Sequence, residues 1–321
     1  MAIIAGIDES GYGPVLGPMV TSTVAFSVPD EMINLSLWEI LRDAISNDLK
    51  SRNQRIAVRD SKKLYRSHHG LGLKPLEVGV LSFLESKGLN ITSFYQLLGS
   101  LSCNDIGIFD QYPWYTGKDF SLPLTTNRVV VLNGADSLNH TFCKRDVRFF
   151  HSSSCVVAVK EFNEQVKLLR NKSIVLFKAS AALVSRLWNL SNDHIRLIVD
   201  KQGGRNTYTN LLQEQLSIAD IRVLKEEDKI STYEVKTAQK KMTISFIEKG
   251  EDRCMTVALA SMFSKYLREL FVRLENQYWL QFIPGLKPTA GYYSDAQRFL
   301  AQIAHIRQRE KIQDDILIRI K

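Results

Sequence analysis

Short apolar and β-branched runs, typical of strands, alternate along the chain with segments whose apolar residues have helical spacing. Together they predict a sheet flanked by helices. Residues 2–8 form a nearly continuous apolar run, and residues 18–27 are apolar and β-branched. We therefore expect two strands, joined by the turn between them into an antiparallel hairpin. Six later segments have a similar strand-like composition: residues 128–132, 154–159, 194–200, 221–224, 231–236 and 242–248.

Helical spacing of apolar residues alternates with these strands. It predicts helices at residues 34–50, 75–87, 161–189, 207–216, 253–281 and 294–304. Residues 58–66 are basic and polar, so a loop is expected there. A hairpin followed by alternating helices and strands predicts a mixed α/β sheet flanked by helices.

The segment at about 88–155 is the hardest to interpret, because turn-forming and aromatic residues crowd it. We expect an insertion or lid whose end returns to the sheet. Its aromatic residues Tyr112, Trp114 and Tyr115 could stack on bases, but packing within the insertion is the favoured interpretation. We expect one domain over residues 1–305 and a C-terminal tail over 306–321.

Composition narrows the class of protein only moderately. The chain is 45% hydrophobic and 24% charged, as in ordinary globular proteins, and its net charge of +8 favours a polyanionic partner. Its four scattered cysteines argue against a zinc site and for free thiols in a reducing compartment. Neither a signal peptide nor an apolar run near the ~20 residues of a membrane span is evident. We expect a cytoplasmic monomer without a membrane partner.

Carboxylates stand at the boundaries of three predicted elements. Asp8 and Glu9 end the first strand, Asp200 ends a later one, and Glu251 and Asp252 open a long helix. Unpaired buried charge is costly, so such groups usually hold a cation or a proton. An oxygen-rich set of this kind suits Mg²⁺ or Mn²⁺. Two such ions about 3.5–4 Å apart would clamp the attacking water and the leaving oxygen of a phosphodiester.

Each acidic group also has an ordinary structural explanation. Glu251 and Asp252 could be favourable charges at a helix N-terminus, and Asp200 could be a turn aspartate. The pair Asp8 and Glu9 at the end of an apolar strand is harder to explain in that way. The conjunction of all three favours a metal site.

Two further segments could hold a polymer beside that site. Residues 11–14 are Gly-Tyr-Gly-Pro, and glycines allow a close backbone approach. Residues 60–64 are Asp-Ser-Lys-Lys-Leu, whose lysines could bind phosphates and whose serine could donate a hydrogen bond to one. A solvated loop is the alternative for the second segment.

Taken in order, these motifs resemble those of the ribonuclease HII family. The family's opening Gly-Ile-Asp-Glu-Ala-Gly-Arg-Gly-Pro is similar to residues 6–14, and its next Gly-Pro to residues 17–18. The other matching segments are Asp60 to Leu64, Asn171 within the helix 161–189, Ile198 to Asp200, Lys249 to Glu251 with the small-residue helix 258–265, and Gly291-Tyr292.

The resemblance covers roughly residues 1–85 and 155–305, and implies an α/β ribonuclease H-like fold. It also implies an endoribonuclease that cleaves RNA paired with or joined to DNA, with two Mg²⁺ or Mn²⁺ ions as cofactors. The implied catalytic metal ligands are Asp8, Glu9, Asp200 and Glu251, with Asp252 as the alternative to Glu251. The implied substrate-binding residues are Gly11, Tyr12, Gly13 and Tyr292. Ser61, Lys62 and Lys63 join them as the phosphate-binding candidates named above.

Two substitutions set this chain apart from the family pattern. Tyr12 stands where the family carries arginine, and Glu251 stands where it carries aspartate. They motivate two alternatives: a nucleic-acid-binding protein of the same fold with altered or lost catalysis, or another nuclease of that fold.

Overall fold

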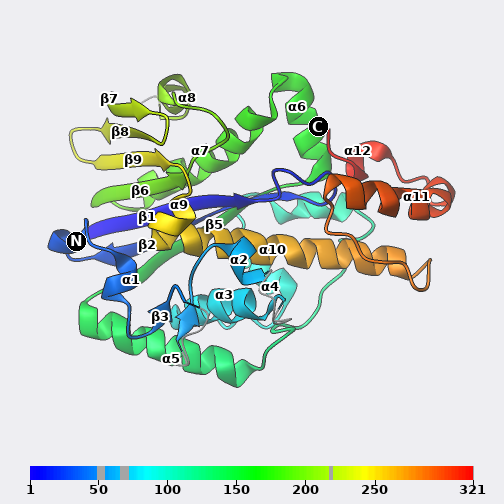
Figure 1. Ribbon diagram of the computed structural model, residues 1–321, viewed down its shortest axis with the longest axis horizontal. Helices are drawn as coiled ribbons and strands as arrows, with labels where there is room; N and C mark the ends of the chain where they lie inside the picture. The colour runs from blue at the N-terminus through cyan, green and yellow to red at the C-terminus, as the bar shows by residue number, and fades with distance from the viewer. Residues whose placement is uncertain (49–54, 66–71, 217–219, 321) are drawn as a thin grey trace.

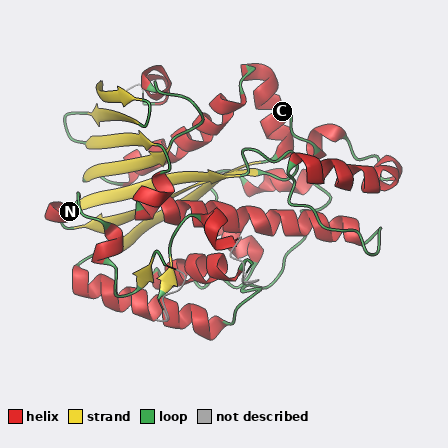
Figure 2. Cartoon of the chain, viewed as in Figure 1, coloured by secondary structure: helices red, strands yellow, loops and turns green. Residues whose placement is uncertain are grey.

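A seven-stranded mixed sheet forms the centre of the molecule (Figures 1 and 2). The computed structural model describes residues 1–48, 55–65, 72–216 and 220–320. The strand order is β5-β2-β1-β6-β9-β8-β7. Its strands are β1 (Ala2–Ser10), β2 (Met19–Val28), β5 (Arg148–Val157), β6 (His194–Asp200), β7 (Asp220–Glu227), β8 (Ile230–Lys236) and β9 (Lys241–Ile247). A separate pair consists of β3 (Ile45–Ser46) and β4 (Ile56–Ala57).

Strand β1 lies inside this sheet and explains the sheet's mixed character. It pairs antiparallel with β2, as the expected hairpin requires, and parallel with β6. Strand β6 pairs parallel with β9. Residues 2–8 are buried throughout, because helices cover both faces of the sheet, and this accounts for their continuous apolar run. The predicted mixed α/β class is confirmed.

Helices cover both faces of the sheet. Helix α10 packs on β1 and β2, with α3 beside it and α5 beyond, while α7 covers the other face (Figure 1). The helices are α1 (Leu37–Ile40), α2 (Ser61–Tyr65), α3 (Lys74–Ser86), α4 (Phe94–Leu101), α5 (Arg128–Arg145), α6 (Val159–Leu169), α7 (Lys172–Leu190), α8 (Thr209–Gln215), α9 (Gly250–Arg253), α10 (Met255–Leu280), α11 (Tyr293–Arg309) and α12 (Asp314–Leu317), with 3-10 turns at Asp30–Met32 and Ile106–Gln111.

Two predictions before residue 70 were wrong. The helix expected at 34–50 is only the short α1 followed by β3, and residues 49–50 lie outside the described part. Leu37, Ile40, Leu41 and Ile45 are buried nevertheless, whereas Leu35 is exposed, because tertiary packing rather than one helical face decides which of these residues are covered. The loop expected at 58–66 contains helix α2, whose start is stabilised when the Asp60 carboxylate accepts a hydrogen bond from the Lys62 amide at 2.9 Å; residue 66 lies outside the description.

The strand predicted at 128–132 was also wrong, because these residues open helix α5. Asn127 caps this helix by accepting a hydrogen bond from the Val130 amide at 3.0 Å. Val131 and Leu138 are buried on one side of the helix, whereas Val129 is exposed. The N-cap and the buried face of the helix therefore outweigh the strand preference of the β-branched residues.

The helix predicted at 161–189 is interrupted, and two helices, α6 and α7, replace it. Arg170 adopts a left-handed backbone with φ 51°, which ends α6. Asn171 then caps α7 by accepting a hydrogen bond from the Ser173 amide at 2.9 Å. The chain changes direction at this break, so the start of α7 lies where a single helix would not have placed it.

The segment 88–155 contributes to the main core. It holds α4, a 3-10 turn, α5 and most of β5, so its end returns to the sheet as expected. Trp114 and Tyr115 are buried against helix α10, with ring centres 6.2 Å from Trp279 and 5.0 Å from Phe271 respectively. The packing interpretation of these aromatic residues is confirmed.

Two further features concern the cysteines and the apolar character of the helices. All four cysteines are free thiols. Among the residues that the structure describes, we find no helix with the length and apolar character needed to cross a membrane.

Candidate active site

Three of the predicted carboxylates meet at one edge of the sheet. Asp8 and Glu9 lie near the C-terminal end of β1, next to the point where the neighbouring parallel strand β6 ends in Asp200. One carboxylate oxygen from each of these residues lies within 4.8 Å of the others. Parallel pairing of β1 with β6 is the reason that residues almost 200 positions apart share this place.

Helix α10 approaches this edge closely because Gly6 has no side chain. A Cβ at Gly6 would lie 2.3 Å from the carbonyl carbon of Thr256. The resulting contact brings two serines of α10 to Asp8: Ser264 donates its hydroxyl to the Asp8 carbonyl at 2.9 Å, and Ser261 forms a hydrogen bond with the carboxylate.

Asp8 is the most buried member of the cluster, at 8% exposure. Its Oδ1 accepts a hydrogen bond from the Glu9 amide at 2.7 Å. Burial, followed by the charges of Glu9 and Asp200, raises the pKa of Asp8 well above its ordinary value. Burial likewise raises the pKa of Glu9. These carboxylates therefore repel one another unless a positive charge joins them.

Glu251 is a fourth carboxylate beside Asp200. The Gly250 amide donates to Asp200 Oδ1 at 2.9 Å, which holds the start of α9 against the end of β6. Burial, followed by the charge of Glu251, raises the pKa of Asp200 to about 8. Glu251 Oε2 is buried without a hydrogen-bond partner in the described residues, so this oxygen is available to a ligand.

Asp252 is placed differently from its neighbour Glu251. Its side chain is 45% exposed, and its carboxylate forms an ion pair with Lys63 at 2.5 Å. Of the two acidic residues at the start of α9, Glu251 is thus the one that adjoins the acidic cluster.

The arrangement fits a hard divalent cation. Its donors are carboxylate oxygens that lie close together and partly buried, with one orphaned oxygen on Glu251. Lys62 supplies part of the compensating charge: burial lowers its pKa, but the charges of Asp8, Glu9 and Asp60 raise it above the ordinary value. Burial and mutual repulsion disfavour the ionised carboxylates, and a bound cation would stabilise their charged forms.

The motif at residues 60–64 lies beside the carboxylates, as expected, but its members differ in accessibility. Lys63 is about half exposed and pairs with Asp252. Ser61 is buried, and its hydroxyl shares a hydrogen bond with Ser261 at 2.8 Å. Ser61 therefore joins α2 to α10, while the lysines carry the charge.

The two glycines of the Gly-Tyr-Gly-Pro turn have different surroundings. Gly11 has φ +96°, and a Cβ there would lie 2.6 Å from Arg268 Nε and 2.7 Å from the Pro18 carbonyl oxygen. Gly13 has no such backbone requirement, and a Cβ there would meet no described atom within 4 Å. The fold explains the glycine at position 11 but not the one at position 13.

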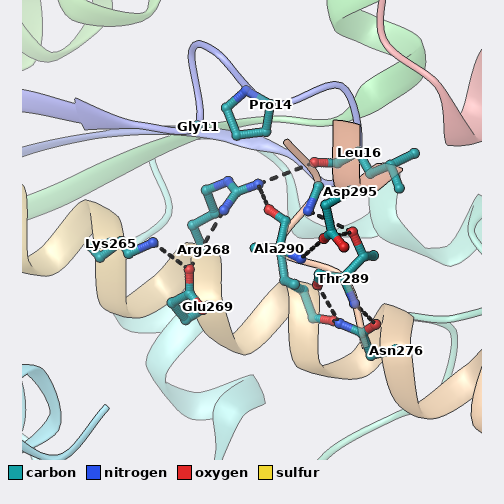
Figure 3. Close-up of polar contacts among 12 residues, drawn as sticks. Gly11, Pro14, Leu16, Lys265, Arg268, Glu269, Asn276, Thr289, Ala290 and Asp295 are labelled. Carbon is teal, nitrogen blue, oxygen red and sulfur yellow. Dashed lines mark hydrogen bonds and ion pairs between the residues drawn. The ribbon is translucent and has the colours of Figure 1, made fainter. Parts of the chain in front are cut away.

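Two buried arginines stabilise this turn and the segments next to it. Arg268 donates to the carbonyls of Leu16 at 3.2 Å and Ala290 at 3.1 Å, as Figure 3 shows. Arg319, from the segment predicted as a tail, donates to the carbonyls of Gly11 at 2.5 Å and of Pro14. Neither arginine was a candidate from sequence, because no local pattern marks a side chain that reaches a turn some 250 or 300 residues away.

Tyr292 is brought beside the turn by backbone contacts. The Gly291 carbonyl accepts hydrogen bonds from the amides of Val15 at 2.8 Å and Leu16 at 3.3 Å. Tyr292 itself is 43% exposed. The predicted pair at 291–292 and the predicted turn at 11–14 thus form one surface, although they are distant in sequence.

Tyr12 extends that surface toward the carboxylates. It is half-buried, and burial followed by the charge of Glu9 raises its pKa. Asp200 and Glu251 line an open cleft of about 540 Å³, together with the glycines at 203 and 204. A ligand therefore has access to these two carboxylates.

No family model matches the chain. A curated relative, ribonuclease HII of Methanocaldococcus jannaschii, is 33% identical over 106 residues, which are 33% of this chain and 37% of that protein. The chain thus matches just over a third of the length of this relative. The resemblance to ribonuclease HII is confirmed, and the mixed sheet agrees with the ribonuclease H-like fold that it implied.

Three solved structures align with nearly the whole chain at low similarity. For the PCNA:RNase HII complex from Archaeoglobus fulgidus, the identity is 14%, the coverage 99% of this chain and 92% of that chain, and the TM-score 0.45. Ribonuclease H2 from Pyrococcus horikoshii OT3 is 15% identical, with coverage of 98% of this chain and 92% of that chain and a TM-score of 0.43. Bst-RNase HIII in complex with Mn²⁺ is 11% identical, with coverage of 99% of this chain and 66% of that chain and a TM-score of 0.44. All three scores are below 0.5, so the fold assignment rests on the strand order described above.

Proposed function

We propose that this chain, a distant relative of ribonuclease HII, is a metal-dependent endoribonuclease. Its substrate would be the RNA phosphodiester in RNA/DNA hybrids or at ribonucleotides in duplex DNA. The observation that carries the proposal is the meeting of Asp8, Glu9 and Asp200 within 4.8 Å, with Glu251 beside them. The similarity to ribonuclease HII and the net charge of +8 support the substrate class.

The residues around the cluster would hold its carboxylates in position before substrate arrives. The Glu9 amide and Ser261 orient Asp8, and the Gly250 amide orients Asp200. A divalent cation bound by these oxygens would supply Lewis acidity, lower the pKa of a water and balance charge on the phosphate. Lys62, kept protonated by the surrounding carboxylates, offers a further positive charge to a phosphate oxygen.

The turn at residues 11–14 would contact the sugar and backbone of the substrate. Gly13 leaves open space on the outer side of this turn, and the exposed Tyr292 lies next to it. Since the charge of Glu9 acts on Tyr12 of this turn, the surface adjoins the carboxylates and is suited to a ribose whose 2′-hydroxyl distinguishes RNA from DNA.

Nucleic-acid binding without turnover is the second candidate, favoured by Tyr12 in place of arginine. The test is incubation with Mg²⁺ or Mn²⁺ and each of three duplexes: an RNA/DNA hybrid, DNA with one ribonucleotide, and branched DNA. We expect cleavage of the hybrid or of the ribonucleotide-containing duplex, with 3′-hydroxyl and 5′-phosphate ends. Binding without cleavage of any duplex would favour the second candidate, and cleavage of branched DNA alone would indicate another nuclease.

A matched pair of variants ties any cleavage to the cluster. Asp8→Asn should abolish activity while the protein still unfolds cooperatively. Asp136→Asn makes the same change at an exposed position on the outer helix α5 and should cleave like the unmodified protein. Full activity of Asp8→Asn would remove Asp8 from the site.

A further inference from the structure

A lysine from another element brings positive charge to the Gly-Tyr-Gly-Pro turn. Nζ of Lys172, the first residue of α7, lies 5.0 Å from the centre of the Tyr12 ring, within the range of a cation–π contact. The side chain can reach the ring because α7 begins anew at Asn171, after the left-handed Arg170. The break in the predicted helix is therefore what places Lys172 over the turn.

Arg205 reaches the same region from the loop that follows β6. Its Nη2 donates to the Ser173 hydroxyl at 2.9 Å, which puts the guanidinium beside the residue that follows Lys172. Its Nε is buried and has no hydrogen-bond partner in the part of the chain that the structure describes. Its positive charge also acts on Tyr12, where it opposes the effect of Glu9 on the phenol pKa.

These two cations have no acidic partner within the described part of the chain. Among the described residues, neither Lys172 nor Arg205 forms an ion pair with a carboxylate, in contrast to Lys63, which is bound to Asp252. Tyr12 contacts Lys172 through its ring, and the charges of both Arg205 and Glu9 act on its phenol group. Positive groups that remain unneutralised, next to an aromatic ring, are the features that bind the backbone of a nucleic acid.

We infer that Lys172 and Arg205, together with Tyr12, bind one backbone phosphate of the nucleic-acid strand next to the acidic cluster. This inference rests on the proposed function. It adds the residues that supply positive charge beside the turn, where Tyr12 stands in place of the arginine of the ribonuclease HII pattern. Tyr12 is neutral, so the turn by itself offers a phosphate its backbone groups and a phenol hydroxyl but no positive charge. Lys172 and Arg205 supply the cationic side chains from two other elements.

The test measures binding without turnover, by fluorescence anisotropy with a short labelled RNA/DNA hybrid in EDTA at several KCl concentrations. Lys172→Gln should weaken binding roughly 5- to 10-fold and lower the slope of log affinity against log salt by about 1. Arg205→Gln should do the same, whereas Arg205→Lys should keep most of the slope. The matched control is Lys178→Gln, an equal charge change at an exposed position of α7 that lines a separate cavity with Cys103 and Arg186.

The inference is overturned if Lys172→Gln and Arg205→Gln bind with the affinity and salt slope of Lys178→Gln. A second variant separates charge from structure: Tyr12→Arg in the Lys172→Gln background should restore the salt slope, and an unrestored slope would also overturn the inference. If the unmodified protein binds the hybrid but never cuts one with Mn²⁺, the proposed catalysis fails while these titrations still decide the phosphate site. Absence of hybrid binding would overturn both.

Discussion

Alanine substitution at Gly13 should separate the requirements of folding from those of substrate contact. The added methyl group would meet no described atom within 4 Å, and the backbone there is not left-handed. Replacing glycine by alanine at such a position stabilises a protein by about 0.4–1 kcal/mol, because the unfolded chain loses freedom. For 321 residues the entropy of unfolding is roughly 0.7 kcal/mol per kelvin, so the Tm should rise by about 1 °C.

The same methyl group should impair function if a nucleic acid approaches this face. Forcing one extra carbon into a packed contact costs about 1–3 kcal/mol, which corresponds to roughly 5- to 150-fold in affinity. We therefore expect Gly13→Ala to be slightly more stable than the unmodified protein, yet to bind and cleave an RNA/DNA hybrid at least about 5-fold less well. Thermal unfolding by circular dichroism and anisotropy titration measure the two effects on one sample.

Gly11→Ala is the matched control, because it adds the same methyl group at a position where the backbone is left-handed and the space is filled. A left-handed backbone costs a non-glycine residue about 1–2 kcal/mol, and the Cβ would also press on the Pro18 carbonyl at 2.7 Å. We expect a loss of about 2–4 kcal/mol, or roughly 3–6 °C in Tm. If Gly13→Ala binds and cleaves normally, no ligand approaches Gly13; if it unfolds as early as Gly11→Ala, our assignment of open space there is wrong.

Three further predictions concern charge. Mn²⁺ at about 100 times its Kd should stabilise the protein by about 2.7 kcal/mol, or roughly 4 °C, in scanning fluorimetry, but should not stabilise Asp8→Asn; equal shifts would contradict a metal site at Asp8. Glu251→Gln should reduce the Mn²⁺ shift and cleavage more than Asp252→Asn, because Asp252 is held in an ion pair; the reverse order would assign the ligand to Asp252. Burial raises the pKa of Glu275 to about 8. The stability that its protonation provides is complete below its ordinary pKa of 4.5 and is lost as the pH rises toward 8. The Tm of the unmodified protein should therefore fall between pH 4.5 and 8, and the Tm of Glu275→Gln should fall less. Parallel curves of Tm against pH for the two proteins would refute this.

The predictions of secondary structure succeeded where the apolar pattern indicated a strand and no helix cap competed with it. The apolar run before Asp8 and the run before Asp200 could be predicted as strands, because strands buried on both faces need apolar residues at every position. The carboxylates at their ends were evident for the same reason: a charge is unexpected where a core strand stops. The predictions at 128–132 and 161–189 failed, because side-chain caps at Asn127 and Asn171 decided the backbone there.

The sequence by itself determined which residue types end the strands, and hence that a carboxylate site was to be expected. Only the tertiary structure decided which of these groups meet. Parallel pairing of β1 with β6 brings Asp8 to Asp200, and the break before α7 carries Lys172 to the turn. The reason is physical: hydrophobic periodicity reports each residue's local environment, whereas charges and hydrogen bonds act between groups that long-range packing brings within a few ångströms.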